Sequence, residues 1–134
     1  LGKFDNGGGS AQVSYSIRTS GTGLFAQMGN GSSVVNSTSY TFGSNTWYQV
    51  VYVWSTSPTK NIVTYINSSS IGTVTHSFSS LFNSSNPLYL GSYNGGEYNQ
   101  WFNGKIGVTR IYNAALSSSQ VLYNYNITKG TYGL

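Results

Sequence analysis

The sequence lacks cysteine and has few charged residues, which make up 6% of the chain. Without cysteine, neither a disulfide framework nor a thiolate metal site can form. The only acidic residues are Asp5 and Glu97, and the only histidine is His76. The composition therefore gives little support to functions that need several carboxylates or histidines at one site.

The low charge does not indicate disorder, because disordered chains combine low hydrophobicity with high net charge. This chain instead has 12 tyrosines, 6 phenylalanines and 3 tryptophans, and 38% of its residues are hydrophobic. Its 134 residues suit a single domain spanning residues 1–134. The expected surface is neutral and rich in serine, threonine, asparagine and glycine, a composition common on extracellular adhesive domains and virion proteins.

The net charge is +4, but the 6 basic residues are dispersed along the sequence. Nucleic-acid-binding domains usually cluster their lysines and arginines, so no nucleic-acid partner is predicted. No apolar stretch approaches the roughly 20 residues of a membrane-spanning helix, so no membrane insertion is predicted. The sequence begins at Leu1, without an initiator methionine or the apolar core of a signal peptide. We therefore expect a processed chain or part of a longer polypeptide.

Alternating apolar and polar residues predict a series of short β-strands. Residues 47–54 give the clearest signal, because they are aromatic or β-branched almost throughout. The pairs Asn30-Gly31 and Asn67-Ser68 indicate hairpin turns. Strands are predicted at residues 11–18, 24–28, 33–41, 47–54, 61–66, 71–75, 88–91 and 105–112.

One helix is predicted near the C-terminus. Ser117 followed by Gln120 matches a capping box, and Val121 and Tyr125 place apolar residues at helical spacing. This helix is expected to end near Asn126. Together the elements predict an all-β fold: a two-sheet antiparallel β-sandwich, or jelly roll, with one short C-terminal helix.

Four motifs occur in a characteristic order. They are Thr-Trp-Tyr-Gln-Val-Val-Tyr at 46–52, Tyr-Ile-Asn-Ser at 65–68, Leu-Tyr-Leu-Gly at 88–91, and Phe-Asn-Gly-Lys-Ile-Gly-Val-Thr-Arg-Ile-Tyr-Asn at 102–113. In this order they resemble the laminin G-like domains of the concanavalin A-like lectin/glucanase superfamily, well over residues 47–126 and loosely over residues 1–40. Residues 121–134 also resemble the end of such domains in tailed-phage virion structural proteins. The resemblance implies a jelly-roll sandwich and a place in a viral particle.

The sequence departs from the family pattern at three places. Ser68 replaces the usual glycine of the hairpin motif, and Gly107 stands where the family has an Asp-Glu pair. The family also begins with one or two strands before the segment that matches Leu1–Lys3. The resemblance therefore implies that the domain lacks its first strand or strands, or is part of a longer chain.

Glycoside hydrolysis, the enzymatic activity found in this superfamily, needs two carboxyl groups that flank the bond to be cleaved. Asp5 and Glu97 are the only carboxylate side chains, and the closely spaced acids of glucanases are absent, so both are interpreted as solvated loop residues. A serine triad would need His76 in contact with a serine and an acid, whereas His76 is expected at the surface or at a strand end. No enzymatic activity is predicted.

Many laminin G-like domains bind calcium at the rim of the sandwich, so the resemblance makes calcium the cofactor to consider. Ca²⁺ takes about 6–8 oxygen ligands, normally with several carboxylates among them. Asp5 and Glu97 are the candidate metal ligands, and a site with two acids at most would be weak. No tightly bound cofactor is predicted.

A segment rich in aromatic and amide side chains is the best candidate for ligand binding. Aromatic ring faces beside amide groups suit sugars, and aromatic residues are also enriched in protein interfaces. The alternative is that the aromatic rings pack at the edge of the core while the asparagines form turns. For Trp101, as for Trp47 and Trp54, packing in the core is the preferred interpretation. The candidate ligand-binding residues are Tyr93, Asn94, Glu97, Tyr98, Asn99 and Trp101.

Two functions from different classes follow from these observations. The first is a non-catalytic structural or decoration domain of a virion capsid, fibre or tail, with adhesion to surface glycans. The alternative is a lectin-like carbohydrate-binding module of a secreted or cell-surface protein. Both predict a virion-surface or extracellular location, and the first predicts oligomeric assembly with other structural chains.

Overall fold

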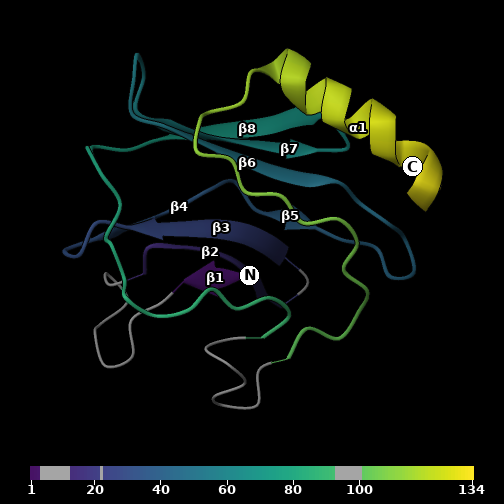
Figure 1. Ribbon diagram of the computed structural model, residues 1–134, viewed down its shortest axis with the longest axis horizontal. Coiled ribbons are helices and arrows are strands. Elements are labelled where there is room, and N and C mark those ends of the chain that lie inside the picture. Colours follow the sequence, from purple (N-terminus) through teal and green to yellow (C-terminus); the bar gives the residue numbers. More distant parts are fainter. Residues whose placement is uncertain (4–12, 22, 93–100) are drawn as a thin grey trace.

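The computed structural model describes residues 1–3, 13–21, 23–92 and 101–134. These residues form two antiparallel β-sheets and one helix, and the helix covers the outer side of one sheet (Figure 1). The predicted all-β, two-sheet sandwich with a C-terminal helix is therefore confirmed.

The first sheet has five strands and comes from the N-terminal part of the chain. Its strands are β1 (Gly2–Lys3), β2 (Tyr15–Ser20), β3 (Gly23–Gly29), β4 (Val34–Asn36) and β5 (Tyr40–Thr41). They are ordered β1-β2-β3-β4, and β5 pairs with the opposite end of β3 from β4. The β2–β3 hairpin turns at Gly21, whose φ of 58 is a left-handed conformation that glycine adopts without strain.

The second sheet is a three-stranded meander. Its strands, in order, are β6 (Val50–Ser55), β7 (Asn61–Ile66) and β8 (Ser69–Thr75). Asn67 and Ser68 connect the last two strands with φ angles of 48 and 66, as a two-residue hairpin turn requires. The hairpin predicted at these residues is confirmed. The strand predicted at residues 47–54 is observed as β6, which begins three residues later than predicted, at Val50.

One apolar cluster fills the space between the two sheets. Ala26 and Met28 of β3 and Ile62 of β7 are buried, with 1%, 6% and 0% of their surface exposed. Tyr52 and Trp54 of β6 pack against this cluster and are themselves partly buried. The prediction that Trp54 lies at the core or its edge is confirmed.

Helix α1 (Ser118–Tyr132) covers the face of the three-stranded sheet that points away from the five-stranded sheet (Figure 1). Its Val121 is fully buried and packs with Val53 of β6 and Tyr65 of β7. Because side chains alternate between the two faces of a strand, the three-stranded sheet contributes one row to the inter-sheet core and the other row to the contact with the helix.

The start of α1 agrees with the sequence and its end does not. The predicted capping box is present: the Gln120 N–H donates to the Ser117 hydroxyl at 3.3 Å, and the Ser117 N–H donates to the Gln120 side-chain oxygen at 2.8 Å. The helix passes the predicted end at Asn126 and continues to Tyr132, because Gly133, with a φ of 69, supplies the left-handed C-cap. Within the described ranges, no helix is long and apolar enough to cross a bilayer.

The prediction of a strand at residues 105–112 is wrong. These residues form neither strand nor helix, and Ile106, Val108 and Ile111 are 45%, 56% and 56% exposed. Their β-branched side chains favour an extended backbone, but a strand also needs a neighbour that completes its hydrogen-bond ladder. No strand among the described residues pairs with this segment.

Two further predicted strands contain fewer paired residues than expected. Residues 33–41 form two short strands, β4 and β5, because the ladder with β3 becomes irregular at Ser37. The Ser37 N–H donates to the Ala26 carbonyl at 2.8 Å, but the Ser37 hydroxyl, and not a backbone carbonyl, accepts the Ala26 N–H at 2.9 Å. Residues 88–91 contain a single antiparallel bridge, from Tyr89 to β1. Hydrophobic alternation alone therefore overestimated how much of this chain is paired.

Candidate binding surface

The segment expected to bind a ligand is closed at its base by backbone pairing. Ser92 and Trp101 form an isolated antiparallel bridge, and the Phe102 N–H donates to the Gly91 carbonyl at 2.8 Å. Gly91 has a φ of 78, a left-handed conformation that disfavours side chains larger than hydrogen. The chain therefore enters and leaves residues 93–100 at one fixed point.

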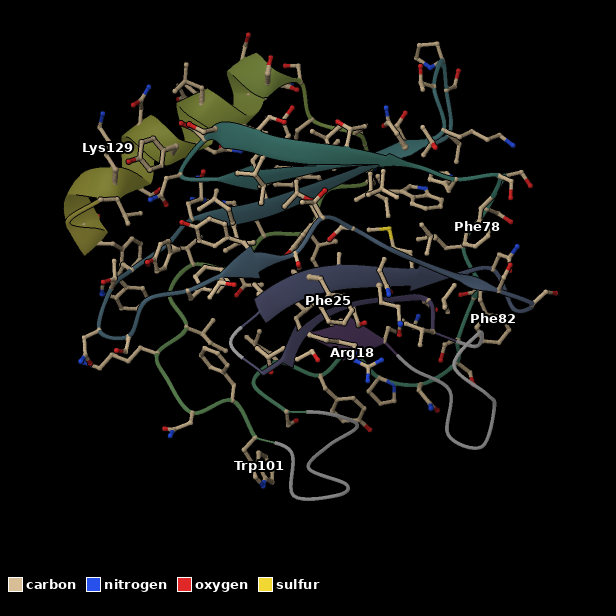
Figure 2. The ribbon with its side chains drawn as sticks, turned by 180° about the vertical axis from the view of Figure 1, so that it is seen from behind. Arg18, Phe25, Phe78, Phe82, Trp101 and Lys129 are labelled. Atoms are coloured by element: carbon tan, nitrogen blue, oxygen red, sulfur yellow. The ribbon has the colours of Figure 1, made fainter. Side chains whose placement is uncertain are left out.

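Trp101 is exposed at this base. Its side chain is 65% exposed and points away from the two sheets (Figure 2). The preference for a core position is therefore wrong, because the bridge to Ser92 keeps the backbone at the surface and no described element covers the indole. Phe102 and Leu90, on the two sides of the same base, are 48% and 53% exposed. The indole of Trp101 lies at the end of the molecule opposite α1 (Figure 2).

The other predicted site residues cannot be compared with the structure. Trp101 is the one member of the predicted ligand-binding set that falls within the described ranges, so only its position is tested. The weak calcium site and the amide contribution to sugar binding stay predictions. The residues outside the described ranges are Asp5, Tyr93, Asn94, Glu97, Tyr98 and Asn99.

Trp47 and Trp54 differ from Trp101 because each is half-buried against another ring. Trp47 contacts Tyr132 of α1, with ring centroids 4.8 Å apart. Trp54 lies parallel to His76, with centroids 3.8 Å apart. These two indoles therefore stabilise the sandwich, whereas the indole of Trp101 is exposed.

His76 follows the last residue of β8, at the strand end where the sequence placed it. Its Nε2 lies 3.1 Å from the carbonyl oxygen of Ser55, so this nitrogen carries the proton. Its Nδ1 is buried and has no hydrogen-bond partner among the described residues. With one ring face on Trp54 and the Phe78 ring at 5.7 Å, His76 is a packing residue at the edge of the core.

Tyr52 brings a phenol hydroxyl to the inter-sheet core. Burial raises the pKa of its phenol to about 12, an effect that the Ser37 hydroxyl opposes. The phenol is consequently neutral over the whole physiological range and cannot serve as a base. Its role is to fill the core while keeping its hydroxyl protonated.

A row of polar side chains crosses the outer face of the five-stranded sheet. The Arg18 guanidinium donates to the Gln27 side-chain oxygen at 2.7 Å, and the Gln27 amide donates to the Asn36 side-chain oxygen at 3.1 Å. Phe25 pairs with Arg18 in the β2–β3 register and shares this face, because Ala26 points into the core. This row was not predictable from the sequence, since it depends on the register of three strands and no local motif marks it.

A small cleft of about 110 Å³ lies between the start of β6 and the end of α1. The Val108 N–H donates to the Tyr132 hydroxyl at 2.9 Å, which ties residues 105–112 to the helix. Ligand pockets usually enclose about 300–1,000 Å³, so the cleft suits one side chain and not a sugar. Its lining includes Trp47, Val50, Gly107, Val108, Arg110 and Tyr132.

A two-sheet antiparallel sandwich with an exposed aromatic residue at one end is the architecture of a jelly-roll binding or structural module. The family model described as the concanavalin A-like lectin/glucanases superfamily matches residues 2–122. The chain therefore belongs to this superfamily, as the order of its motifs indicated.

Two further comparisons complete the result. The chain is similar to the crystal structure of residues 221–444 of an S-layer domain-containing protein from Clostridium thermocellum ATCC 27405, at 19% identity and a TM-score of 0.47. The match covers 93% of this chain and 61% of that chain, so this chain spans less than two thirds of that structure. No curated protein matches the sequence at a significant level.

Proposed function

We propose that the protein is a non-catalytic surface module that adheres to carbohydrate and forms part of an extracellular or virion-surface assembly. The observation that carries this proposal is the 65% exposed indole of Trp101 at the base of residues 93–100. An indole face packs against the apolar C–H face of a sugar ring, and side-chain amides both donate and accept hydrogen bonds from sugar hydroxyls. Membership of the lectin/glucanase superfamily supports the same function.

The setting of Trp101 favours binding over packing. The bridge to Ser92 and the hydrogen bond from Phe102 to Gly91 hold the backbone on both sides of the indole. A side chain that is exposed and fixed at its backbone needs little reorganisation when a ligand arrives, so less binding energy is lost in ordering it.

The absence of catalysis is supported by the composition. A glycosidase would need Asp5 and Glu97, the only carboxylate side chains, to face each other across the scissile bond. The separation of the two groups would have to be about 5–5.5 Å for retention or about 6.5–9.5 Å for inversion. Polysaccharide hydrolysis that disappears in Glu97→Gln would contradict the proposal.

A virion is the setting that the sequence favours for this module. The resemblance of residues 121–134 to the ends of tailed-phage structural domains and the low charge of the chain support it. The test is sedimentation of the native material on a density gradient. Fixed stoichiometry with a particle is the expected result. A free, light species would instead favour the alternative, a secreted or cell-surface lectin-like module.

A glycan array tests the adhesive function. Trp101→Ala should abolish binding to every glycan that the wild-type protein retains. Tyr123→Ala is the matched control, because Tyr123 is also an aromatic residue with 65% exposure but lies on α1. Equal loss in both variants, or no loss in either, would contradict the assignment of Trp101.

A further inference from the structure

The three-stranded sheet has an open edge. β6 pairs with β7 on one side, and no described strand pairs with it on the other. The Gln49 carbonyl accepts the Asn67 N–H at 2.9 Å, just before β6 begins. Backbone groups of an antiparallel strand alternate in direction, so every second residue after Gln49 faces β7 and the residues between face the open edge. Those that face the open edge are Val50, Tyr52 and Trp54.

The open edge lacks the charges, prolines and bulges that commonly prevent strand pairing. Edge strands are commonly protected by lysine, proline or a bulge, whereas Val50–Ser55 contains no charged residue and no proline. Both faces of β6 are fixed, because Trp54 packs in the inter-sheet core and Val53 packs under α1. The edge is therefore a rigid, extended template.

Residues 105–112 run past β5 and β6 towards α1 (Figure 1). The cleft described above is lined on one side by Val50 of β6 and on the other by Gly107, Val108 and Arg110. Apart from the bond between Val108 and Tyr132, the described residues supply no hydrogen bond to the backbone of this segment. Two unpaired stretches of backbone thus flank one cleft.

The segment is also basic, and no acidic side chain lies beside it among the described residues. Lys105 and Arg110 are exposed, and neither makes an ion pair, hydrogen bond or ring contact within the part of the chain that the structure describes. Every charged side chain in that part is basic, since the two acids of the sequence are Asp5 and Glu97. The described residues therefore offer Lys105 and Arg110 no carboxylate side chain, and an acidic partner would complement their charge.

We propose that the open edge of β6 receives an extended strand of a partner protein, in which apolar residues alternate with acidic ones, and that one of its side chains enters the cleft beside residues 105–112. The strand adds to the edge of β6 through the backbone groups of Val50, Tyr52 and Trp54, a recognised mode of peptide binding. Its apolar side chains cover Ile106, Val108 and Ile111, which are otherwise about half exposed. Its carboxylates meet Lys105 and Arg110, and arginine favours the paired hydrogen bonds that a carboxylate offers.

The test uses three synthetic peptides with the wild-type protein. The first alternates valine with glutamate and threonine, the second carries lysine at the glutamate positions, and the third has proline at its centre. Calorimetry should detect binding of the glutamate peptide and weaker or no binding of the other two. In NMR spectra, the amides of Val50, Tyr52 and Trp54 should gain protection from hydrogen exchange when the glutamate peptide binds.

Two variants test the backbone edge of β6 and the charge of residues 105–112 separately. Val50→Pro removes the backbone N–H of Val50, which faces the open edge. Proline is tolerated at the first residue of a strand, so the variant should fold and should lose binding of the glutamate peptide. Arg110→Glu should lower the affinity for the glutamate peptide about fivefold, which corresponds to the loss of one exposed ion pair. The same variant should restore binding of the lysine peptide. Lys60→Glu is the matched control, because Lys60 lies beyond the other end of β6 and should leave both affinities unchanged.

Three results would overturn the inference. One is equal affinity for the glutamate and lysine peptides, because charge would then play no part. Another is protection of the three β6 amides without peptide in a dimeric sample, which would assign the edge to a second copy of the chain. The last is the same protection in a longer natural form of the protein, which would assign the edge to another segment of the same polypeptide. Each result is independent of glycan binding, because the glycan test depends on Trp101.

Discussion

The imidazole of His76 lies face to face with the indole of Trp54, with ring centroids 3.8 Å apart and the ring planes within 2° of parallel. His76 stands just after β8 and Trp54 near the end of β6, so the contact spans the width of the three-stranded sheet. It covers the edge of the inter-sheet core where the loop after β6 leaves it open.

Replacing His76 by alanine should therefore destabilise the protein. His76→Ala removes the stacked ring and the hydrogen bond to the Ser55 carbonyl, which together should cost about 2 kcal/mol. Urea denaturation followed by tryptophan fluorescence measures this loss. His76→Phe keeps a ring over Trp54 and should recover about half of it, whereas equal stability of wild type and His76→Ala would contradict the role given to the stack.

A methyl group at Gly72 should be incompatible with the contact between the two sheets. A Cβ built at Gly72 would overlap the side chain of Thr38, so Gly72→Ala should destabilise by about 1–3 kcal/mol through overpacking. Thr38→Gly makes room for the new methyl group, and the double variant should be more stable than the sum of the single changes predicts. Additive effects in this cycle would show that the two positions do not meet.

The ionisation of Tyr52 should make stability fall at high pH. Its pKa is about 12 in the folded protein and 10.0 when unperturbed, so the folded state favours the protonated phenol. This contribution is complete below pH 10 and is lost as the pH rises from 10 to 12, because only the unfolded chain ionises in that range. Chemical denaturation at several pH values tests the effect, and Tyr52→Phe should remove this part of the pH dependence while leaving the contributions of other groups.

The capping box should contribute measurably to the docking of α1. Ser117→Ala removes the hydroxyl that accepts the Gln120 N–H and should cost about 1 kcal/mol. Ser119→Ala, at the second residue of the same helix, keeps the cap and should change stability by less than about 0.5 kcal/mol. Thermal denaturation by circular dichroism compares the two, and equal melting temperatures for both variants would contradict the prediction.

Features encoded by short stretches of sequence were predictable. The β7–β8 turn was predictable from Asn67-Ser68, because asparagine is one of the few residues besides glycine that tolerate a left-handed backbone. The start of α1 was predictable from the capping box of Ser117 and Gln120. The motif order also identified the superfamily. The extension of α1 to Tyr132 was not foreseen, because Gly130 can equally end a helix or be tolerated within it.

Features that depend on pairing between distant segments were not predictable. Residues 105–112 have the composition of a strand, but whether they form one is decided by a neighbour that no local pattern specifies. The exposure of Trp101 is set by a bridge to Ser92, and large aromatic residues are buried in most proteins. The row from Arg18 to Asn36 requires the register of three strands, which short-range signals do not provide.

The outer edge of the five-stranded sheet has a consequence for the order of events during synthesis. The Gly2 N–H donates to the Tyr89 carbonyl at 3.0 Å, and the Ser84 N–H donates to the Ser14 hydroxyl across 70 residues of chain. The β2–β3 hairpin, with β1 paired to Tyr15 and Ser16, and the β6–β8 meander can form as soon as they leave the ribosome. The contacts of Gly2 with Tyr89 and of Ser14 with Ser84 have to wait until most of the chain has emerged. Contacts that close such long loops form slowly, so this edge of the five-stranded sheet stays open to proteases and chaperones until residues 84–89 have been made.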